Sequence, residues 1–148
     1  MSIGLAVRRF GRVGGMESVA FSFAHWLVRA GHQVDVWTSE ICGDTDGIQI
    51  RKMNARGRGV LWKAKSLRGA LRRIPVSEYE GFLHFERGGV GGTYRAGAGC
   101  HASWVRQRGS RIGDRWITAL DCESMVHADR IVVNSHMVLS EVMDLYGL

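Results

Sequence analysis

The chain has 148 residues, enough for one domain with a hydrophobic core, and its 45% hydrophobic and 23% charged residues are ordinary for a globular protein. The formal charge of +6 favours a polyanionic neighbour: nucleic acid, an anionic lipid surface or phosphorylated small molecules. A single proline excludes a Pro-rich linker, and three widely spaced cysteines without a CxxC pair argue against structural zinc. No secretory signal opens the sequence and no apolar run reaches the ~20 residues of a membrane span, so we expect a cytoplasmic protein.

The first forty residues are typical of one β-α-β unit. Residues 3–7 form a short apolar run, and a stretch containing glycines separates them from a helical pattern. From Met16 to Ala30 apolar residues recur at three- and four-residue steps, which places them on one helix face, and Gly31 ends the helix. Residues 33–37 are then predicted to form a strand. Such a unit makes a right-handed crossover between two parallel strands.

The rest of the sequence continues the alternation of strands and helices. It predicts an α/β fold, a Rossmann-like doubly wound and mostly parallel sheet in three layers, α/β/α. Pro75 stops the longest of the later helices, and the first of the later strands is expected at an edge of the sheet. The later elements are expected at residues 48–51 (strand), 60–74 (helix), 82–85 and 93–96 (strands), 103–107 and 116–127 (helices), 131–133 (strand) and 136–146 (helix).

The loop between the first strand and the first helix is the first candidate binding site. Gly14 and Gly15 let the backbone approach a ligand closely, and the free N–H groups at a helix start favour an anion. In open parallel sheets the ligand lies beyond the carboxyl ends of the strands, where this loop falls. We therefore favour a binding loop over a plain turn. The spacing differs from G-x-G-x-x-G, which disfavours an NAD enzyme.

A second glycine-rich stretch, residues 86–92, follows the predicted fourth strand. Four glycines in five residues do not favour a helix, so a flexible loop at the same end of the sheet is expected. Arg87 is a candidate contact for a phosphate or carboxylate. A solvated loop with Glu86 and Arg87 on the surface explains the local pattern equally well.

A third stretch, residues 94–101, combines small residues with Arg95 and His101. His101 is a candidate catalytic group, because an imidazole near its pKa can polarise or hydrogen-bond a hydroxyl. A structural or exposed histidine is the alternative. Cys100 is expected to be a small buried residue, since nothing around it indicates a depressed thiol pKa.

The helix predicted at residues 60–74 is strongly cationic. No acid occurs between Gly47 and Val76, so the segment carries charge of one sign. Solvated cations on an ordinary core helix are one interpretation, and a peripheral site for anionic lipid is the other. Nucleic-acid binding is not expected, because no recognisable nucleic-acid motif accompanies the charge. The candidate membrane-surface residues are Trp62, Lys63, Lys65, Arg68, Arg72 and Arg73.

Three stretches, in this order and spacing, resemble the N-terminal domain of GT-B retaining glycosyltransferases of the branch that includes lipopolysaccharide-core glucosyltransferases. They are residues 7–38, with Gly14-Gly15 and a later Ala-Gly-His, residues 94–104, and residues 128–135. The resemblance implies a two-domain enzyme whose N-terminal domain mainly holds the acceptor and whose C-terminal domain holds most of a nucleotide-diphosphate sugar. It implies no metal and no cofactor besides that co-substrate.

By the same resemblance, Gly14 and Gly15 approach the donor diphosphate or the acceptor, and Arg95 and His101 line the acceptor side. Many relatives in the branch carry an aspartate where this chain has Ala98, which puts that residue's catalytic role in doubt here.

We therefore expect residues 1–148 to be the acceptor-side half of a hexosyltransferase acting on lipopolysaccharide or another glycolipid, without the C-terminal donor-binding domain. Without that domain, residues 1–148 should have negligible glycosyltransferase turnover. Expected partners are the donor, the acceptor, an anionic inner-membrane surface, and either a C-terminal domain partner or a second copy. The alternatives are a non-catalytic binding module for an anionic glycan or nucleotide, and a subunit of a split enzyme.

Overall fold

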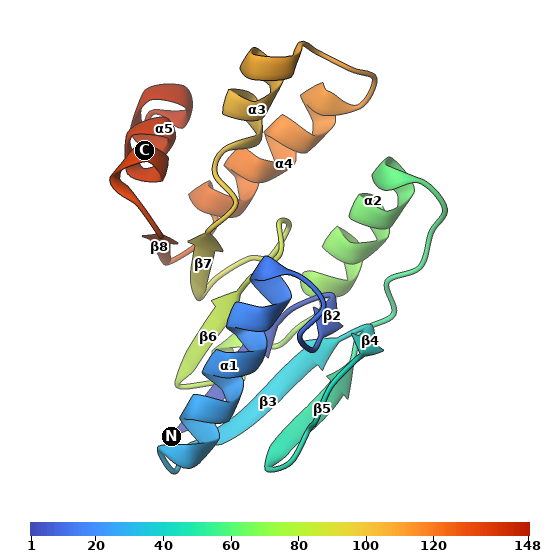
Figure 1. Cartoon of the computed structure of the whole chain (residues 1–148), viewed down its shortest axis with the longest axis vertical. Helices are drawn as coiled ribbons and strands as arrows, with labels where there is room; N and C mark the ends of the chain where they lie inside the picture. The colour runs from blue at the N-terminus through green and yellow to red at the C-terminus, as the bar shows by residue number, and fades with distance from the viewer.

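Strands and helices alternate along the computed structural model, which describes residues 1–148 (Figure 1). In chain order the elements are β1 (Ser2–Ala6), β2 (Arg9–Phe10), α1 (Gly15–Arg29), β3 (Gln33–Thr38), β4 (Glu40–Ile41), β5 (Ile48–Lys52), α2 (Val60–Leu71), the 3-10 turn η1 (Val76–Glu78), β6 (Gly81–His84), β7 (Thr93–Ala96), α3 (His101–Arg108), α4 (Asp114–Val126), β8 (Arg130–Val133) and α5 (His136–Tyr146).

Six of the strands form one sheet in the order β5-β3-β1-β6-β7-β8, and all their pairings are parallel. The remaining two, β2 and β4, pair with each other beside it. The predicted mostly parallel α/β fold of Rossmann type is therefore confirmed. So is the edge position of the strand near residue 48, because β5 pairs only with β3.

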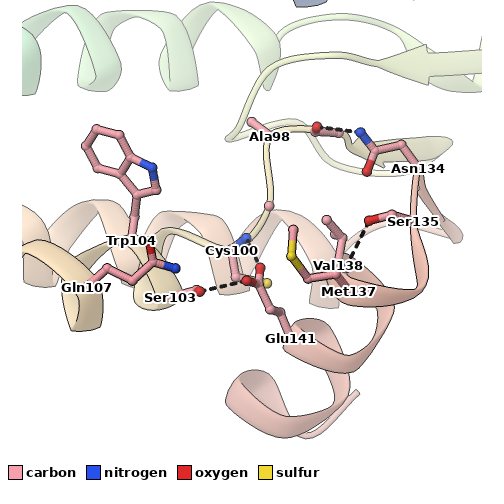
Figure 2. Close-up of a pocket in the computed structure, with 12 residues that line it drawn as sticks. Ala98, Cys100, Ser103, Trp104, Gln107, Asn134, Ser135, Met137, Val138 and Glu141 are labelled. Carbon is pink, nitrogen blue, oxygen red and sulfur yellow. Dashed lines mark hydrogen bonds between the residues drawn. The ribbon is translucent and has the colours of Figure 1, made fainter.

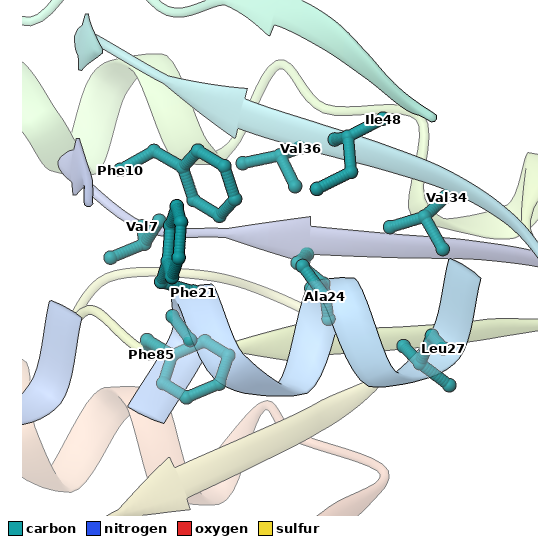
Figure 3. Close-up of a cluster of buried hydrophobic side chains, with 11 residues drawn as sticks. Val7, Phe10, Phe21, Ala24, Leu27, Val34, Val36, Ile48 and Phe85 are labelled. Atoms are coloured by element: carbon teal, nitrogen blue, oxygen red, sulfur yellow. The ribbon is translucent and has the colours of Figure 1, made fainter. Parts of the chain in front are cut away.

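Helix α1 covers one face of the sheet and builds the largest core cluster (Figure 3). Ala20, Ala24 and Leu27 recur along the helix at three- and four-residue steps and are buried against that face. Leu5 and Val36 alternate inward from β1 and β3 to meet them. The helix ends as predicted beside Gly31, whose φ of 85° suits a residue without Cβ.

The opposite face packs against α2, α4 and α5. Leu67 and Leu71 of α2 are buried with Phe82, while Met125 of α4 and Val142 of α5 belong to a separate cluster. Helix α2 stops three residues earlier than expected, and a turn then carries the chain to Pro75.

Helices therefore cover the two faces unequally, as the view in Figure 1 with α1 in front of the sheet indicates. On the α1 face, strands β6 to β8 have no helix of their own. An apolar groove of about 450 Å³ lies there, bordered by Phe23, Leu83, Phe85 and Val132, with Arg95 at its margin.

The glycine-rich stretch after β6 starts at the rim with Glu86 and continues as a packed crossover connection, so the prediction of a flexible loop is wrong for it. Gly88 and Gly89 are buried. The Gly88 N–H donates to Ser124 Oγ at 2.7 Å, and a Cβ on Gly89 would lie 2.4 Å from His84 Nδ1. Because β6 and β7 are parallel, the chain must return along the sheet, and glycine fits there because a Cβ on Gly88 or Gly89 would press on Arg68 of α2 or on the His84 ring.

Candidate functional site

The parallel strands bring their carboxyl ends to one rim of the sheet, where the predicted binding loops meet. The backbone N–H of Arg8, after β1, donates to Glu86 Oε1, after β6, at 3.0 Å. The side-chain amide of Asn134, after β8, donates to the carbonyl of Gly97, after β7, at 2.9 Å. Loops far apart in sequence are thus joined directly into one surface, the position at which open α/β sheets bind ligands.

Gly14 and Gly15 form the start of α1 at this rim. Gly14 is the N-cap residue, with extended backbone and no side chain capping the helix, so the first amides stay available. A Cβ on Gly14 would meet the Glu17 carboxylate at 2.5 Å, whereas one on Gly15 would meet nothing within 4 Å. The loop can therefore present amides to a ligand, although Glu17 competes for the same positive end of the helix.

Glu86 is a site residue that sequence reasoning missed. Its carboxyl is partly buried at the centre of the rim, and burial raises its pKa, with the carboxylate of Glu17 acting in the same direction. Arg8 opposes the shift. A carboxyl whose pKa is raised gives up its proton less readily than an ordinary glutamate, a property found in side chains that do general acid–base work. The available signal was an acid directly after a buried strand.

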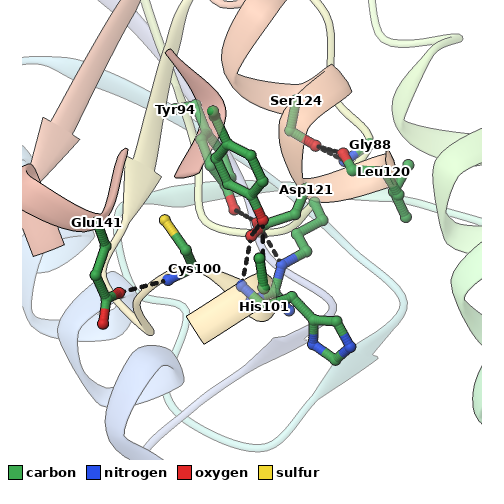
Figure 4. Close-up of polar contacts among 11 residues, drawn as sticks. Gly88, Tyr94, Cys100, His101, Leu120, Asp121, Ser124 and Glu141 are labelled. Atoms are coloured by element: carbon green, nitrogen blue, oxygen red, sulfur yellow. Dashed lines mark hydrogen bonds and ion pairs between the residues drawn. The ribbon is translucent and has the colours of Figure 1, made fainter. Parts of the chain in front are cut away.

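Arg87, predicted to contact a phosphate or carboxylate, is engaged inside the protein. Its Nε lies 2.6 Å from Oδ1 of Asp121, whose side chain is fully buried. That carboxylate also accepts a hydrogen bond from the backbone N–H of His101 at 2.8 Å (Figure 4). The Tyr146 hydroxyl donates a second one at 2.8 Å. Asp121 therefore ties the β6 and β7 connections to α4 and α5.

His101, the predicted catalytic residue, begins α3 and turns its ring away from Asp121 (Figure 4). Its Nε2 lies 3.0 Å from Oδ1 of Asp114 in α4, and Arg108 holds the same oxygen at 2.7 Å. The Arg108 guanidinium lowers the pKa of Asp114, and His101 adds to the effect. This arrangement links α3 to α4, so the catalytic role of His101 stays a prediction.

Arg95 is the predicted site residue whose cation has no partner. It forms no ion pair, and its guanidinium lies 5.8 Å from the ring centroid of Phe85. Gly97 leaves room for it, because a Cβ there would collide with the guanidinium. Arg95 thus reaches from β7 toward the rim on the α1 face.

A pocket of about 380 Å³ opens beside the β7 loop at Ala98 (Figure 2). Glu141 of α5 shapes it, accepting from the Cys100 N–H at 3.0 Å and from Ser103 Oγ at 2.6 Å. Trp104 contributes an aromatic side chain to the lining. Cys100 is buried as expected, and burial raises its thiol pKa to about 12, which disfavours a nucleophile.

The predicted cationic surface is partly neutralised by tertiary ion pairs. Arg68 Nη2 lies 2.7 Å from Glu123 Oε1 on α4, and Arg72 pairs with the same carboxylate. Among the predicted membrane residues, Trp62 remains 68% exposed, with Lys65 Nζ 5.3 Å from its ring centroid. Lys63, Lys65 and Arg73 form no ion pairs, so the unpaired charge lies mainly at the start of α2.

No three His, Cys, Asp or Glu side chains come together as metal ligands, and no helix has the length and apolarity to cross a bilayer.

A family model described as Glycosyltransferase Family 4 matches residues 13–148. Among solved structures, the chain is similar to WaaG, a glycosyltransferase involved in lipopolysaccharide biosynthesis, with a TM-score of 0.79 and 14% sequence identity. That match covers 98% of this chain and 42% of WaaG, so the chain spans less than half the length of the protein it resembles. No curated protein matches the sequence.

Proposed function

Since the chain belongs to glycosyltransferase family 4, we propose that residues 1–148 form the acceptor-side domain of a GT-B retaining hexosyltransferase. The reaction moves a sugar from a nucleotide-diphosphate donor to a lipopolysaccharide or other glycolipid acceptor. The observation that carries the proposal is the rim itself, where Arg8 contacts Glu86, Asn134 contacts Gly97, and a pocket opens alongside.

The rim supplies one wall of a catalytic cleft. Glu86 with its raised pKa and the unpaired Arg95 are groups suited to orient or deprotonate a hydroxyl and to hold an anion. A departing nucleotide diphosphate needs cations and amides from both sides of a cleft. The donor-side wall is therefore assigned to a C-terminal domain, in the same chain or a partner, and this domain alone should turn over negligibly.

The exposed start of α2 supports a peripheral position on the cytoplasmic face of the inner membrane. Trp62 offers an aromatic anchor, and Lys65 lies against it. Basic residues near an anionic surface contribute roughly 1 kcal/mol each. Arg68 and Arg72 contribute less than their number suggests, because both are paired with Glu123.

A non-catalytic glycan-binding module is the second candidate. It is favoured by Ala98 in the β7 loop and by the engagement of His101 with Asp114, which together leave that loop without a free catalytic group.

The test is a backbone amide NMR titration with UDP-glucose, with a lipopolysaccharide-core oligosaccharide, and with short DNA at low salt. The proposal expects saccharide-induced shifts at Gly14, Gly97 and Ala98, and none with DNA. Shifts confined to the opposite rim, or none with any sugar, would remove it. Sugar release measured after adding a family donor-side domain separates the enzyme from the binding module, since the module would give binding without turnover.

A further inference from the structure

A second rim pocket, distinct from the one at Ala98, lies at the carboxyl ends of β1, β3 and β5. Its volume is about 360 Å³. Its lining comes from the loop after β1, the end of β3, the segment after β5 and the first turn of α2. The residues are Arg8, Ser39, Glu40, Ala55, Arg56, Gly57 and Lys63.

The pocket holds positive charge that no carboxylate pairs with. Of the eight ion pairs within 4.0 Å in the chain, none involves Arg8, Arg56 or Lys63. The acid in the lining, Glu40, is already paired with Arg9 through Nε and Oε2 at 3.5 Å. Nearby Glu86 accepts the backbone N–H of Arg8, not its guanidinium.

Ser39, one of the lining residues, carries a hydroxyl that the chain does not use. Ser39 Oγ is shielded from solvent and has no hydrogen-bond partner in the chain. Its backbone N–H donates to the Arg8 carbonyl at 3.0 Å, which holds the residue beside that arginine. A buried hydroxyl without a partner costs free energy, and turning the Ser39 hydroxyl toward a ligand oxygen in the pocket would recover it.

The backbone that carries Arg56 is held close to the start of α2 by tight packing. Gly57 has a φ of 157°, and a Cβ on it would lie 2.9 Å from the carbonyl carbon of Trp62 and 3.0 Å from the Lys63 nitrogen. The Arg56 N–H donates to Ser66 Oγ at 2.8 Å. Both contacts fix the backbone of the segment after β5 against α2, so the places from which Arg56 and Lys63 extend are set before a ligand arrives.

From the charge, the buried hydroxyl and the fixed geometry, we propose that this pocket binds a phosphate monoester group on the acceptor. Two arginines and a lysine match the charge and the several acceptor oxygens of a phosphate. The inference rests on the proposed function, and it names the acceptor as a phosphorylated saccharide. The phosphate would be held at β1 and β3, while the sugar extends along the rim toward Gly97.

A lipid headgroup is the other source of the same chemistry, and the neighbouring surface is where it would act. Trp62, Lys65 and Arg58 border a separate hollow of about 590 Å³ that shares Arg56 and Gly57 with the rim pocket. Soluble phosphates and vesicles must therefore be tested in parallel.

The experiment titrates the protein with inorganic phosphate, glucose 6-phosphate and glucose, followed by amide NMR, and with phosphatidylglycerol vesicles followed by co-sedimentation. Phosphate and glucose 6-phosphate should saturate shifts at Ser39, Arg56 and Gly57. Arg56→Gln and Lys63→Gln should each weaken binding about tenfold, and Ser39→Ala a few-fold, because hydrogen bonds to a charged group are the stronger ones.

Arg29→Gln is the matched control, since it removes one exposed, unpaired charge from the far end of α1 and should leave phosphate affinity unchanged. Thermal unfolding of each variant confirms folding. Equal weakening by Arg29→Gln would mean that only net charge matters, and would overturn the proposal. The proposal would also be overturned if the protein bound no soluble phosphate while Arg56→Gln and Lys63→Gln lost vesicle binding. That result would assign the pocket to lipid headgroups. If saccharides shift the Gly97 amide but phosphate does not bind, the phosphate subsite is wrong. The proposed function would still stand in that case.

Discussion

Arg87 and Asp121 form an ion pair at 2.6 Å across 34 residues of sequence, and the aspartate side chain has no exposed surface. A buried charge is tolerated only when it is paired and its remaining lone pairs are satisfied. Tyr94, His101 and Tyr146 supply those further hydrogen bonds. The pair therefore fixes the connections that follow β6 and β7 to α4, and with them the shape of the rim.

Asp121→Asn should destabilise the fold by about 3–5 kcal/mol, because it leaves Arg87 partly buried without a counter-charge. Urea unfolding of the variant measures the loss. Asp144→Asn, at an exposed position of α5, is the control and should change stability by less than about 0.5 kcal/mol. Adding Arg87→Met to Asp121→Asn should recover part of the loss. Equal stability of the two single aspartate variants would contradict the role assigned to the pair.

Two glycines should respond oppositely to the same substitution. Gly89→Ala places a methyl group 2.4 Å from the His84 ring and should cost about 1–3 kcal/mol. Gly69→Ala, at an exposed position in the last turn of α2 with nothing within 4 Å, should stabilise by about 0.5–1 kcal/mol. Chemical denaturation of both variants checks the pair. A neutral Gly89→Ala would show that the crossover is loosely packed.

His84 should make stability depend on pH. Its side chain is 1% exposed, and burial lowers its pKa from 6.5 to about 4. The unfolded chain takes up the proton first, so stability is full above about pH 6.5 and falls as the pH drops toward 4, by on the order of 3 kcal/mol.

Carboxylates such as Asp114 and Glu123, whose pKa values are lowered by arginines, also lose stabilisation in acid. Urea midpoints of the parent and of His84→Leu, compared at pH 7.5 and pH 4.5, isolate the histidine contribution. The variant should lose less stability across this range, and parallel pH profiles would refute the assignment.

Trp62→Ala should weaken binding to phosphatidylglycerol vesicles roughly tenfold, since burying a large side chain in the interface contributes a few kcal/mol at most. Trp26→Ala is the control, because Trp26 is also exposed but lies on α1, on the other face of the sheet. Binding should also weaken as salt is added. Salt-independent binding, or equal loss in the two variants, would remove the membrane proposal.

Local sequence determined the order and type of the six strands of the main sheet and of the five α-helices, but not the short strands β2 and β4 or the turn η1. The steps between Ala20, Ala24 and Leu27, the stop at Gly31 and the short apolar runs are all properties of neighbouring residues, so periodicity reveals them. The meeting of the loops at one rim followed as well, because parallel strands connected by helices must end on the same side. The family resemblance rested on the same local stretches.

Only the tertiary structure decided which charged groups are free. Arg68 and Glu123 are 55 residues apart, and Arg87 and Asp121 are 34 apart, so the pairs that neutralise predicted site residues leave no local pattern. The same holds for the burial of Glu86, the packing of Gly89 against His84, and the gathering of Arg8, Arg56 and Lys63 around Ser39. Electrostatic and packing energies depend on distance in space, whereas a sequence reports distance along the chain.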